Sequence, residues 1–161
     1  IDHRELGDGP SAGEYRLSLL KVDDLIQRGG TMNESDLNPV VIEGMYQQQF
    51  SPDGRYLLTT QYAGIWDKAS TVILWDVETG AQIAAIEGGE QSAFSPDGSL
   101  LATEQLEGIA VYAVAAVIAG ETQPITVLPY PDKIDEIVFS ADSTLLFART
   151  IRTVELWAVP G

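Results

Sequence analysis

The residues Phe50-Ser51-Pro52-Asp53-Gly54 open a unit that occurs three times in this chain. The next two copies start at Phe94 and Phe139, so they follow at intervals of 44 and 45 residues. Each opening leads into an apolar run and then into a second run that ends on an aromatic residue, as in Thr71-Val72-Ile73-Leu74-Trp75-Asp76. Alternation of this kind is typical of β-strands. The spacing therefore predicts a repeat protein built from strands.

Each unit contains four predicted strands, which we name outer, innermost, second and third in chain order. Four strands in about 40 to 45 residues are typical of a β-propeller blade. We therefore predict an all-β fold of antiparallel propeller blades, about three complete and one partial, with no helix between residues 38 and 159. The strands that end on Trp75 and Trp157 should be equivalent third strands. The second strands are apolar runs, so both of their faces should be buried; they cover residues 55–60, 99–103 and 144–148.

The repeat also sets the expected boundaries. Residues 1–13 lack apolar periodicity and read as a loose lead-in, and residues 14–161 form the propeller part. Residues 14–44 would be an incomplete blade with an insertion at 23–38, which could pack as a short helical turn or serve as a contact loop. The remaining units are expected at 45–86, 90–128 and 134–159, the last without its outer strand.

Pro and Gly favour a tight turn after the phenylalanine in the first two copies, because Pro fixes φ and Gly tolerates positive φ. The third copy, Ser140-Ala141-Asp142-Ser143, has neither residue, so we expect a less rigid turn there.

Composition limits the classes of partner. The chain has 161 residues, 9 Lys and Arg against 24 Asp and Glu, and a formal charge of -15. Such a surface repels phosphate backbones, which argues against nucleic acid and favours a basic protein or peptide. No apolar run approaches the roughly 18 residues of a membrane span. The absence of cysteine fits a reducing or an oxidising compartment and leaves localisation open.

The units resemble the WD-repeat family of β-propellers, specifically the bacterial-type repeats with Phe-Ser-Pro-Asp-Gly turns. Trp75-Asp76 is the one copy of the dipeptide that names the family, and the Gly-His dipeptide is replaced in all units, for example by Gly88-Gly89. The buried His, Ser/Thr, Asp and Trp network of the family therefore cannot form, and apolar packing should stabilise the blades. Gln48 and Ser92 stand where the family has an aliphatic residue on the innermost strand, whereas Ile137 conforms.

We find no pattern that indicates catalysis. Phosphate loops, metal spacings and nucleophile elbows are missing, which predicts no cofactor, no metal and no enzyme activity. Acidic pairs such as Asp135-Glu136 are explained as a solvated face in so acidic a chain. An enzyme active site in the central channel would need polar side chains to converge there, namely Gln47, Gln49, Gln91 and Asp135. The sequence shows no set of an acid, a base and an orienting group among them.

The resemblance implies that partners dock on the rim that carries the outer-to-innermost and second-to-third connections. The loop at residues 61–70 is longer than its equivalents and contains Tyr62 and Trp66, which are residue types enriched at interface hot spots. Trp66 could equally fold back and cap its blade. The candidate protein-binding residues are Tyr62, Trp66, Lys68, Tyr130, Asp132 and Arg152.

Two functional hypotheses remain at this point. The first is a non-catalytic protein-interaction scaffold. The second is a regulatory or sensor propeller domain of a larger enzyme or signalling protein, which flanking sequence would reveal. In either case the units are too few for a closed ring of four to eight blades. We expect the missing blades to come from the rest of a longer polypeptide or from another copy of this chain that meets it head to tail.

Overall fold

The computed structural model describes residues 16–19, 40–43, 48–62, 70–130 and 133–159. These residues form four antiparallel sheets, which we call the first to the fourth in the order of the chain. The first sheet contains β1 (Arg16–Leu19) and β2 (Val40–Glu43). The second contains β3 (Gln48–Phe50), β4 (Tyr56–Tyr62), β5 (Ser70–Asp76) and β6 (Gln82–Glu87).

The third sheet repeats the order of the second, and the fourth has three strands. The third sheet contains β7 (Ser92–Phe94), β8 (Leu100–Gln105), β9 (Gly108–Ala113) and β10 (Thr126–Pro129). The fourth contains β11 (Glu136–Phe139), β12 (Leu145–Arg149) and β13 (Val154–Ala158). The prediction of an all-β fold of four-stranded blades is confirmed, and the Trp75 and Trp157 strands are equivalent third strands.

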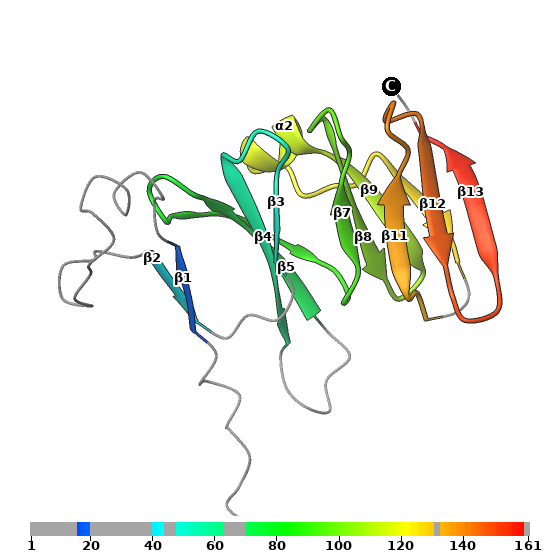
Figure 1. Cartoon of the computed structure of the whole chain (residues 1–161), viewed down its shortest axis with the longest axis horizontal. Coiled ribbons are helices and arrows are strands. Elements are labelled where there is room, and N and C mark those ends of the chain that lie inside the picture. The colour runs from blue at the N-terminus through cyan, green and yellow to red at the C-terminus, as the bar shows by residue number, and fades with distance from the viewer. Residues whose placement is uncertain (1–15, 20–39, 44–47, 63–69, 131–132, 160–161) are drawn as a thin grey trace, which may run out of the picture.

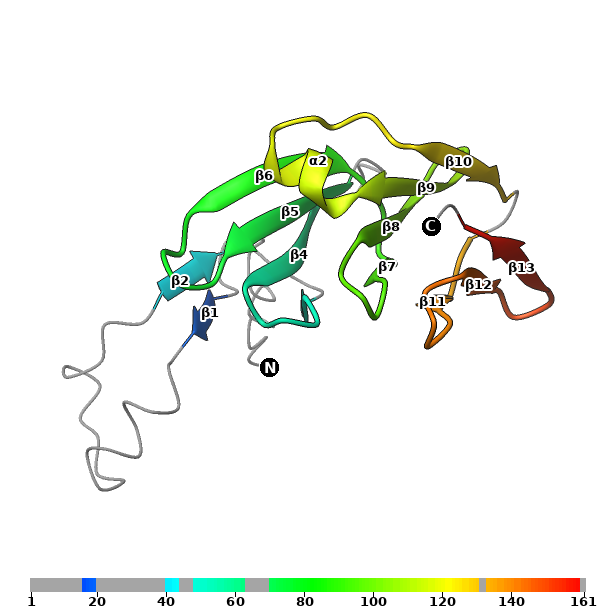
Figure 2. The same cartoon turned by 90° about the horizontal axis from the view of Figure 1, so that it is seen from above.

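The sheets stand side by side along an arc, and the chain proceeds from one sheet to the next (Figures 1 and 2). One apolar core lies between the second and third sheets and includes Leu74 and Leu101. Another lies between the third and fourth sheets and includes Val111 and Leu146. The second, third and fourth sheets are thus stabilised mainly by burying a face against a neighbour, because removal of apolar surface from water is the largest favourable contribution to folding.

The turns that join innermost and second strands share one hydrogen-bond pattern. In the third sheet, Ser95 Oγ donates to Asp97 Oδ1 (2.6 Å) and accepts from Leu100 N (2.9 Å). The equivalent bonds join Ser51 with Asp53 (2.5 Å) and Ser140 with Asp142 (2.6 Å).

The third copy of the turn keeps this pattern although it lacks Gly. Ser143 adopts φ 62°, close to the φ of 74° at Gly98 in the preceding copy. Non-glycine residues reach this region at an energetic cost. Whether the turn is less rigid stays a prediction.

The expectation of no helix between residues 38 and 159 is wrong at one short element, α2 (Val114–Ile118). It lies in the connection from the third strand to the outer strand of the third sheet and replaces no strand. Val114 and Val117, three residues apart, are buried on one side of this turn of helix. Gly120 follows with φ 89°, a conformation that commonly ends helices.

Burial of the second strands agrees with prediction in β4 and β8 but not in β12. Leu57 to Thr60 are all buried in β4, whereas Leu145 is 38% exposed and Phe147 is half-buried in β12. No described sheet covers that side of the fourth sheet, which is why the prediction of two covered faces is wrong there.

Part of a polar network exists in the second sheet despite the missing histidine. Trp75 Nε1 donates to Thr59 Oγ1 across neighbouring strands (2.8 Å). In the third sheet Tyr112 takes the place of the tryptophan, and its hydroxyl accepts from Gln105 Nε2 (2.8 Å). Apolar packing is therefore supplemented by one polar contact in each of these sheets.

Candidate protein-interaction surface

The connections between strands gather at two opposite edges of the sheets. The upper edge in Figure 1 carries the turns at Asp53, Asp97 and Asp142 and helix α2, and we call it the turn rim. The lower edge carries the connections from outer to innermost strands and from second to third strands, and we call it the lower rim. The lower rim is the edge on which the sequence analysis places the binding residues.

Two aliphatic side chains on the lower rim are almost fully exposed. Leu106 lies at the tip of the β8–β9 hairpin and is 76% exposed, and Ile151 lies at the tip of the β12–β13 hairpin and is 84% exposed. They are 45 residues apart and occupy equivalent positions on adjacent sheets. Exposed apolar side chains are common singly, and the repetition of this pair at equivalent positions makes the edge our candidate contact surface.

Charged groups link the two sheets on the same rim. Lys133 Nζ lies 3.2 Å from Glu90 Oε2, and both side chains remain largely exposed. The half-buried carboxylate of Glu104 accepts hydrogen bonds from Gln91 N and from Ile134 N, each at 3.3 Å. Since Ile134 belongs to the segment that enters the fourth sheet, Glu104 joins the third and fourth sheets at this edge. These contacts therefore link the third and fourth sheets at the rim that also carries Leu106 and Ile151.

The binding residues predicted from sequence are placed unevenly. Arg152 is exposed next to Ile151, and its backbone N donates to Thr150 Oγ1 (3.1 Å). Trp66, Lys68, Asp132 and the side chain of Tyr62 lie outside the described residues.

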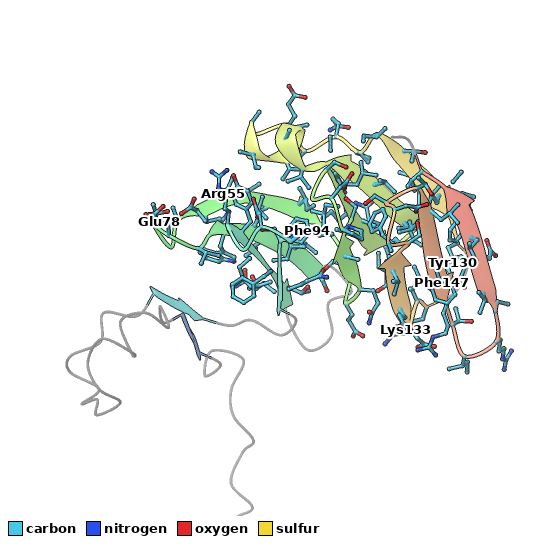
Figure 3. All side chains as sticks on the ribbon, turned by 45° about the horizontal axis from the view of Figure 1, so that its top comes forward. Arg55, Glu78, Phe94, Tyr130, Lys133 and Phe147 are labelled. Carbon is cyan, nitrogen blue, oxygen red and sulfur yellow. The ribbon has the colours of Figure 1, made fainter. Side chains whose placement is uncertain are left out.

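Tyr130 is placed in the core and not on the open rim. Its side chain is only 4% exposed, its hydroxyl is 3.0 Å from Thr153 Oγ1, and its ring meets Trp157 edge to face at 5.8 Å. The Tyr130 side chain therefore packs the end of the third sheet, just after β10, against the fourth sheet (Figure 3).

Leu106 and Ile151 were missed by the sequence reasoning. Each is a lone aliphatic residue inside a polar hairpin tip, in Gln105-Leu106-Glu107 and Thr150-Ile151-Arg152. Their common phase in the repeat was a usable signal. The loops at residues 104–107 and 150–152 were expected on this rim, but attention went to aromatic and charged residues, so neither aliphatic residue was singled out.

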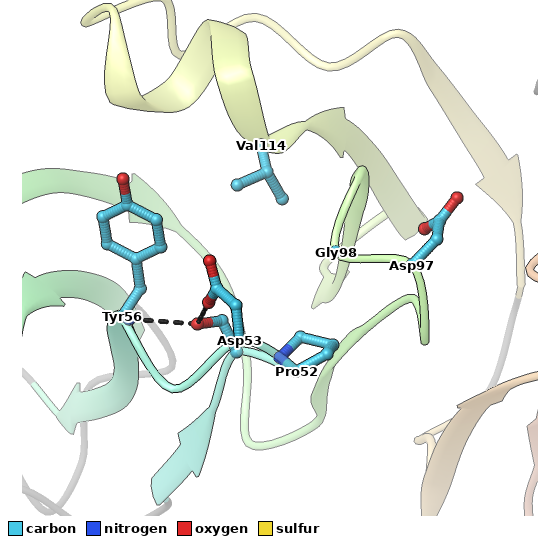
Figure 4. Close-up of a pocket in the computed structure, with 7 residues that line it drawn as sticks. Pro52, Asp53, Tyr56, Asp97, Gly98 and Val114 are labelled. Carbon is cyan, nitrogen blue, oxygen red and sulfur yellow. Dashed lines mark hydrogen bonds between the residues drawn. The ribbon is translucent and has the colours of Figure 1, made fainter.

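The turn rim carries a pocket of about 320 Å³ between the second and third sheets (Figure 4). Asp53, Tyr56 and Val114 are among its lining residues, and Gly98 contributes no side chain to it. Hydrogen bonds from Ser95 and Ser99 lower the pKa of Asp97 at its edge to about 2. Hydrogen bonds from Ser51 and from the backbone of Arg55 likewise lower the pKa of Asp53. Both carboxylates are thus ionised at neutral pH, which makes this rim anionic.

The described residues contain no group of three or more His, Cys, Asp or Glu side chains arranged to hold a metal ion. Within the same part of the chain, no helix has the length and apolar character needed to cross a membrane.

Comparisons with known proteins support the fold. Protein-family models and curated protein sequences gave no match. Among solved structures, the chain is similar to "Structure of U3-55K" (20% identity, TM-score 0.58), covering 71% of this chain and 36% of that one. It is equally similar to "Crystal structure of RRP9 WD40 repeats" (20% identity, TM-score 0.58), covering 71% of this chain and 35% of that one. The fold is therefore that of WD40-repeat propellers, and the chain spans about a third of the length of these two structures.

Proposed function

We propose that this chain is a non-catalytic scaffold that binds a basic protein or peptide through its lower rim. The observation that carries the proposal is the pair of exposed aliphatic side chains, Leu106 and Ile151, at equivalent hairpin tips. WD40 propellers are typically non-catalytic and act in protein interactions, which agrees with this role. The charge of -15 favours a partner rich in Lys and Arg.

The proposal includes completion of the ring by further blades, from the same polypeptide or from another chain. β13 pairs with β12 on one side, and the described residues provide no strand for its other side. An unpaired edge of this kind is a template for another strand. The apolar side chains that β13 leaves in water, Val154 and Leu156, support the same conclusion.

Selection from a random peptide library on the immobilised chain would test the rim. We expect peptides that combine apolar residues with Lys or Arg, because they match Leu106 and Ile151 within an acidic surface. The double variant Leu106→Asp/Ile151→Asp should weaken their binding by about tenfold or more, as is typical for loss of hot-spot contacts. Calorimetric titration measures the change.

Ile125→Asp provides the matched control, since Ile125 is 48% exposed just before β10 and away from the hairpin tips. It should leave the affinity unchanged. Peptides that bind equally well to all three proteins would place the contact elsewhere and contradict the proposal.

A further inference from the structure

The face of the third sheet that the fourth sheet covers shows which side chains such a junction contains. The face of the third sheet that points to the fourth carries only small or aliphatic residues and is buried to 6% exposure or less. Its members are Ala93, Leu100, Ala102, Ile109 and Val111. At the edge of this face Glu104 Oε1 accepts from Ile134 N of the next unit (3.3 Å). A following unit that offers a backbone N–H therefore meets an acceptor.

The equivalent face of the fourth sheet is uncovered among the described residues. Register and repeat spacing place on it Val138, Leu145, Phe147, Arg149, Val154 and Leu156, and we call this set the uncovered face. Val138, Val154 and Leu156 are 43%, 56% and 58% exposed. Exposure of this extent on a contiguous apolar sheet face is typical of a binding surface.

Two positions of the uncovered face differ in chemistry from the covered one. Arg149 stands at the position of Glu104, and Phe147 (labelled in Figure 3) stands at the position of Ala102. Arg149 Nε donates to Glu136 Oε2 (2.8 Å), while its side chain is still 46% exposed. A guanidinium has five N–H donors and no acceptor, so Arg149 cannot accept from a backbone N–H as Glu104 does, and the carboxylate of Glu136 beside it already accepts from the guanidinium. Phe147 also fills space that Ala102 leaves free at the covered junction.

We infer that the uncovered face is covered by a propeller unit that differs from the units of this chain. The covering unit offers carbonyl or carboxylate acceptors to Arg149 and small side chains to Phe147. This inference rests on the proposed completion of the ring and names the chemistry of the unit that completes it.

A second copy of this chain does not meet the requirement. The residues of the second sheet that would face it are already covered within their own chain, since Leu57 is 1% and Ile73 is 4% exposed. Its later units present Ile134 N, which is a donor and not an acceptor. Coverage of the second sheet and the donor at Ile134 thus both disfavour docking of these units of another copy on this face.

A tandem extension of the full chain tests the inference. A copy of residues 115–161 is added directly after Val159, which occupies the repeat position of Val114. The added segment supplies an outer strand for β13 and a unit that presents the N–H of a second Ile134. We expect this unit to remain undocked on the natural uncovered face.

The same extension is then made with Glu136→Gln, Phe147→Ala and Arg149→Glu, which give the uncovered face the residues of the third sheet at these positions. The added unit should now dock, and amide hydrogen exchange in β13 should slow by about tenfold or more relative to the unsubstituted extension. The three substitutions without the extension serve as the control for folding by circular dichroism.

Equal protection of β13 in both extended proteins would overturn the inference, because the three positions would then not select the unit. Absence of protection in both would overturn it as well, and would also contradict completion of the ring by a blade. Peptide binding at Leu106 and Ile151 is measured separately, so failure of the rim proposal is distinguishable from either outcome. Concentration-dependent dimers of the natural chain that protect Leu156 would also contradict the inference.

Discussion

The strands β5 and β13 carry nearly the same residues at equivalent positions and have opposite environments. Val72 and Leu74 of β5 are 1% and 2% exposed, whereas Val154 and Leu156 of β13 are 56% and 58% exposed. Both strands pair with the second strand of their own sheet. The difference lies in what covers them, since the third sheet packs on β5 and no described sheet packs on β13. Burial in this fold is thus a property of the junction between units and not of the strand.

The largest expected effect comes from truncating the same residue in both strands. Leu74→Ala should lower the free energy of unfolding by about 3 kcal/mol, because it removes buried methyl groups and leaves a cavity. Leu156→Ala removes the same groups from a mostly hydrated site and should cost less than about 1 kcal/mol. Urea unfolding followed by tryptophan fluorescence measures both. Similar losses for the two variants would mean that β13 is covered in solution.

A second contrast concerns the outer strand, which pairs with β9 and which the described residues do not provide for β13. Gly108 begins β9 with φ 142°, and a Cβ there would overlap the carbonyl oxygen of Leu128 in β10. Gly108→Ala should therefore cost about 2 to 3 kcal/mol, through backbone strain and displacement of β10. The matched control is Thr153→Ala at the start of the β13 hairpin arm, which loses the hydroxyl contact to Tyr130 and should cost about 1 kcal/mol. Thermal unfolding measures the decrease in Tm for both variants. Equal decreases would contradict the conclusion that close packing of β10 requires glycine at position 108.

The aspartate turns should behave alike in covered and uncovered sheets, because their hydrogen bonds are local. The pKa of Asp53, of Asp97 and of Asp142 is lowered in each case, first by a serine two residues earlier. A lowered folded-state pKa gives stability that is fully present above the unfolded-state pKa near 3.8 and is lost as the pH falls through the folded value, about 2 for Asp97. NMR titration of the carboxyl carbons should show all three groups titrating below 3.8.

Ser95→Ala should return the pKa of Asp97 toward its ordinary value and leave the pKa of Asp142 unchanged. If Asp142 instead titrated near the unperturbed value in the natural chain, the turn of the fourth sheet would depend on its neighbours as the strands do.

The smallest expected effect is at Ser143, where two contributions oppose each other. Its φ of 62° is unfavourable for a non-glycine residue, and its Oγ accepts from Asp97 N of the preceding turn (3.2 Å). Ser143→Gly relieves strain of about 1 kcal/mol and loses a hydrogen bond of about 1 kcal/mol, so unfolding should change little. Ser143→Ala keeps the strain and loses the bond, and should cost about 1 kcal/mol. A stability gain of more than about 1 kcal/mol for Ser143→Gly would show that the bond between turns contributes nothing.

Prediction from sequence succeeded where the repeat determines structure locally. The phase of Phe50, Phe94 and Phe139 located the sheets and the turns, because each turn is made by its own residues. It failed for α2, because Val114 and Val117 continue an apolar pattern that also fits a strand end. For the proposed binding surface, the loops of the lower rim were named from sequence, but Leu106 and Ile151 within them were not singled out.

The sequence by itself determined the repeat, the strand order and the acidic character of this protein, since these follow from residue spacing and charge. Only the tertiary structure decided that Tyr130 packs against Trp157, that Leu106 and Ile151 face solvent, and that no described sheet covers the apolar face of β12 and β13. The physical reason is that identical residues such as Leu74 and Leu156 have the same strand preference, whereas the free energy of hiding them from water depends on which sheet stands opposite.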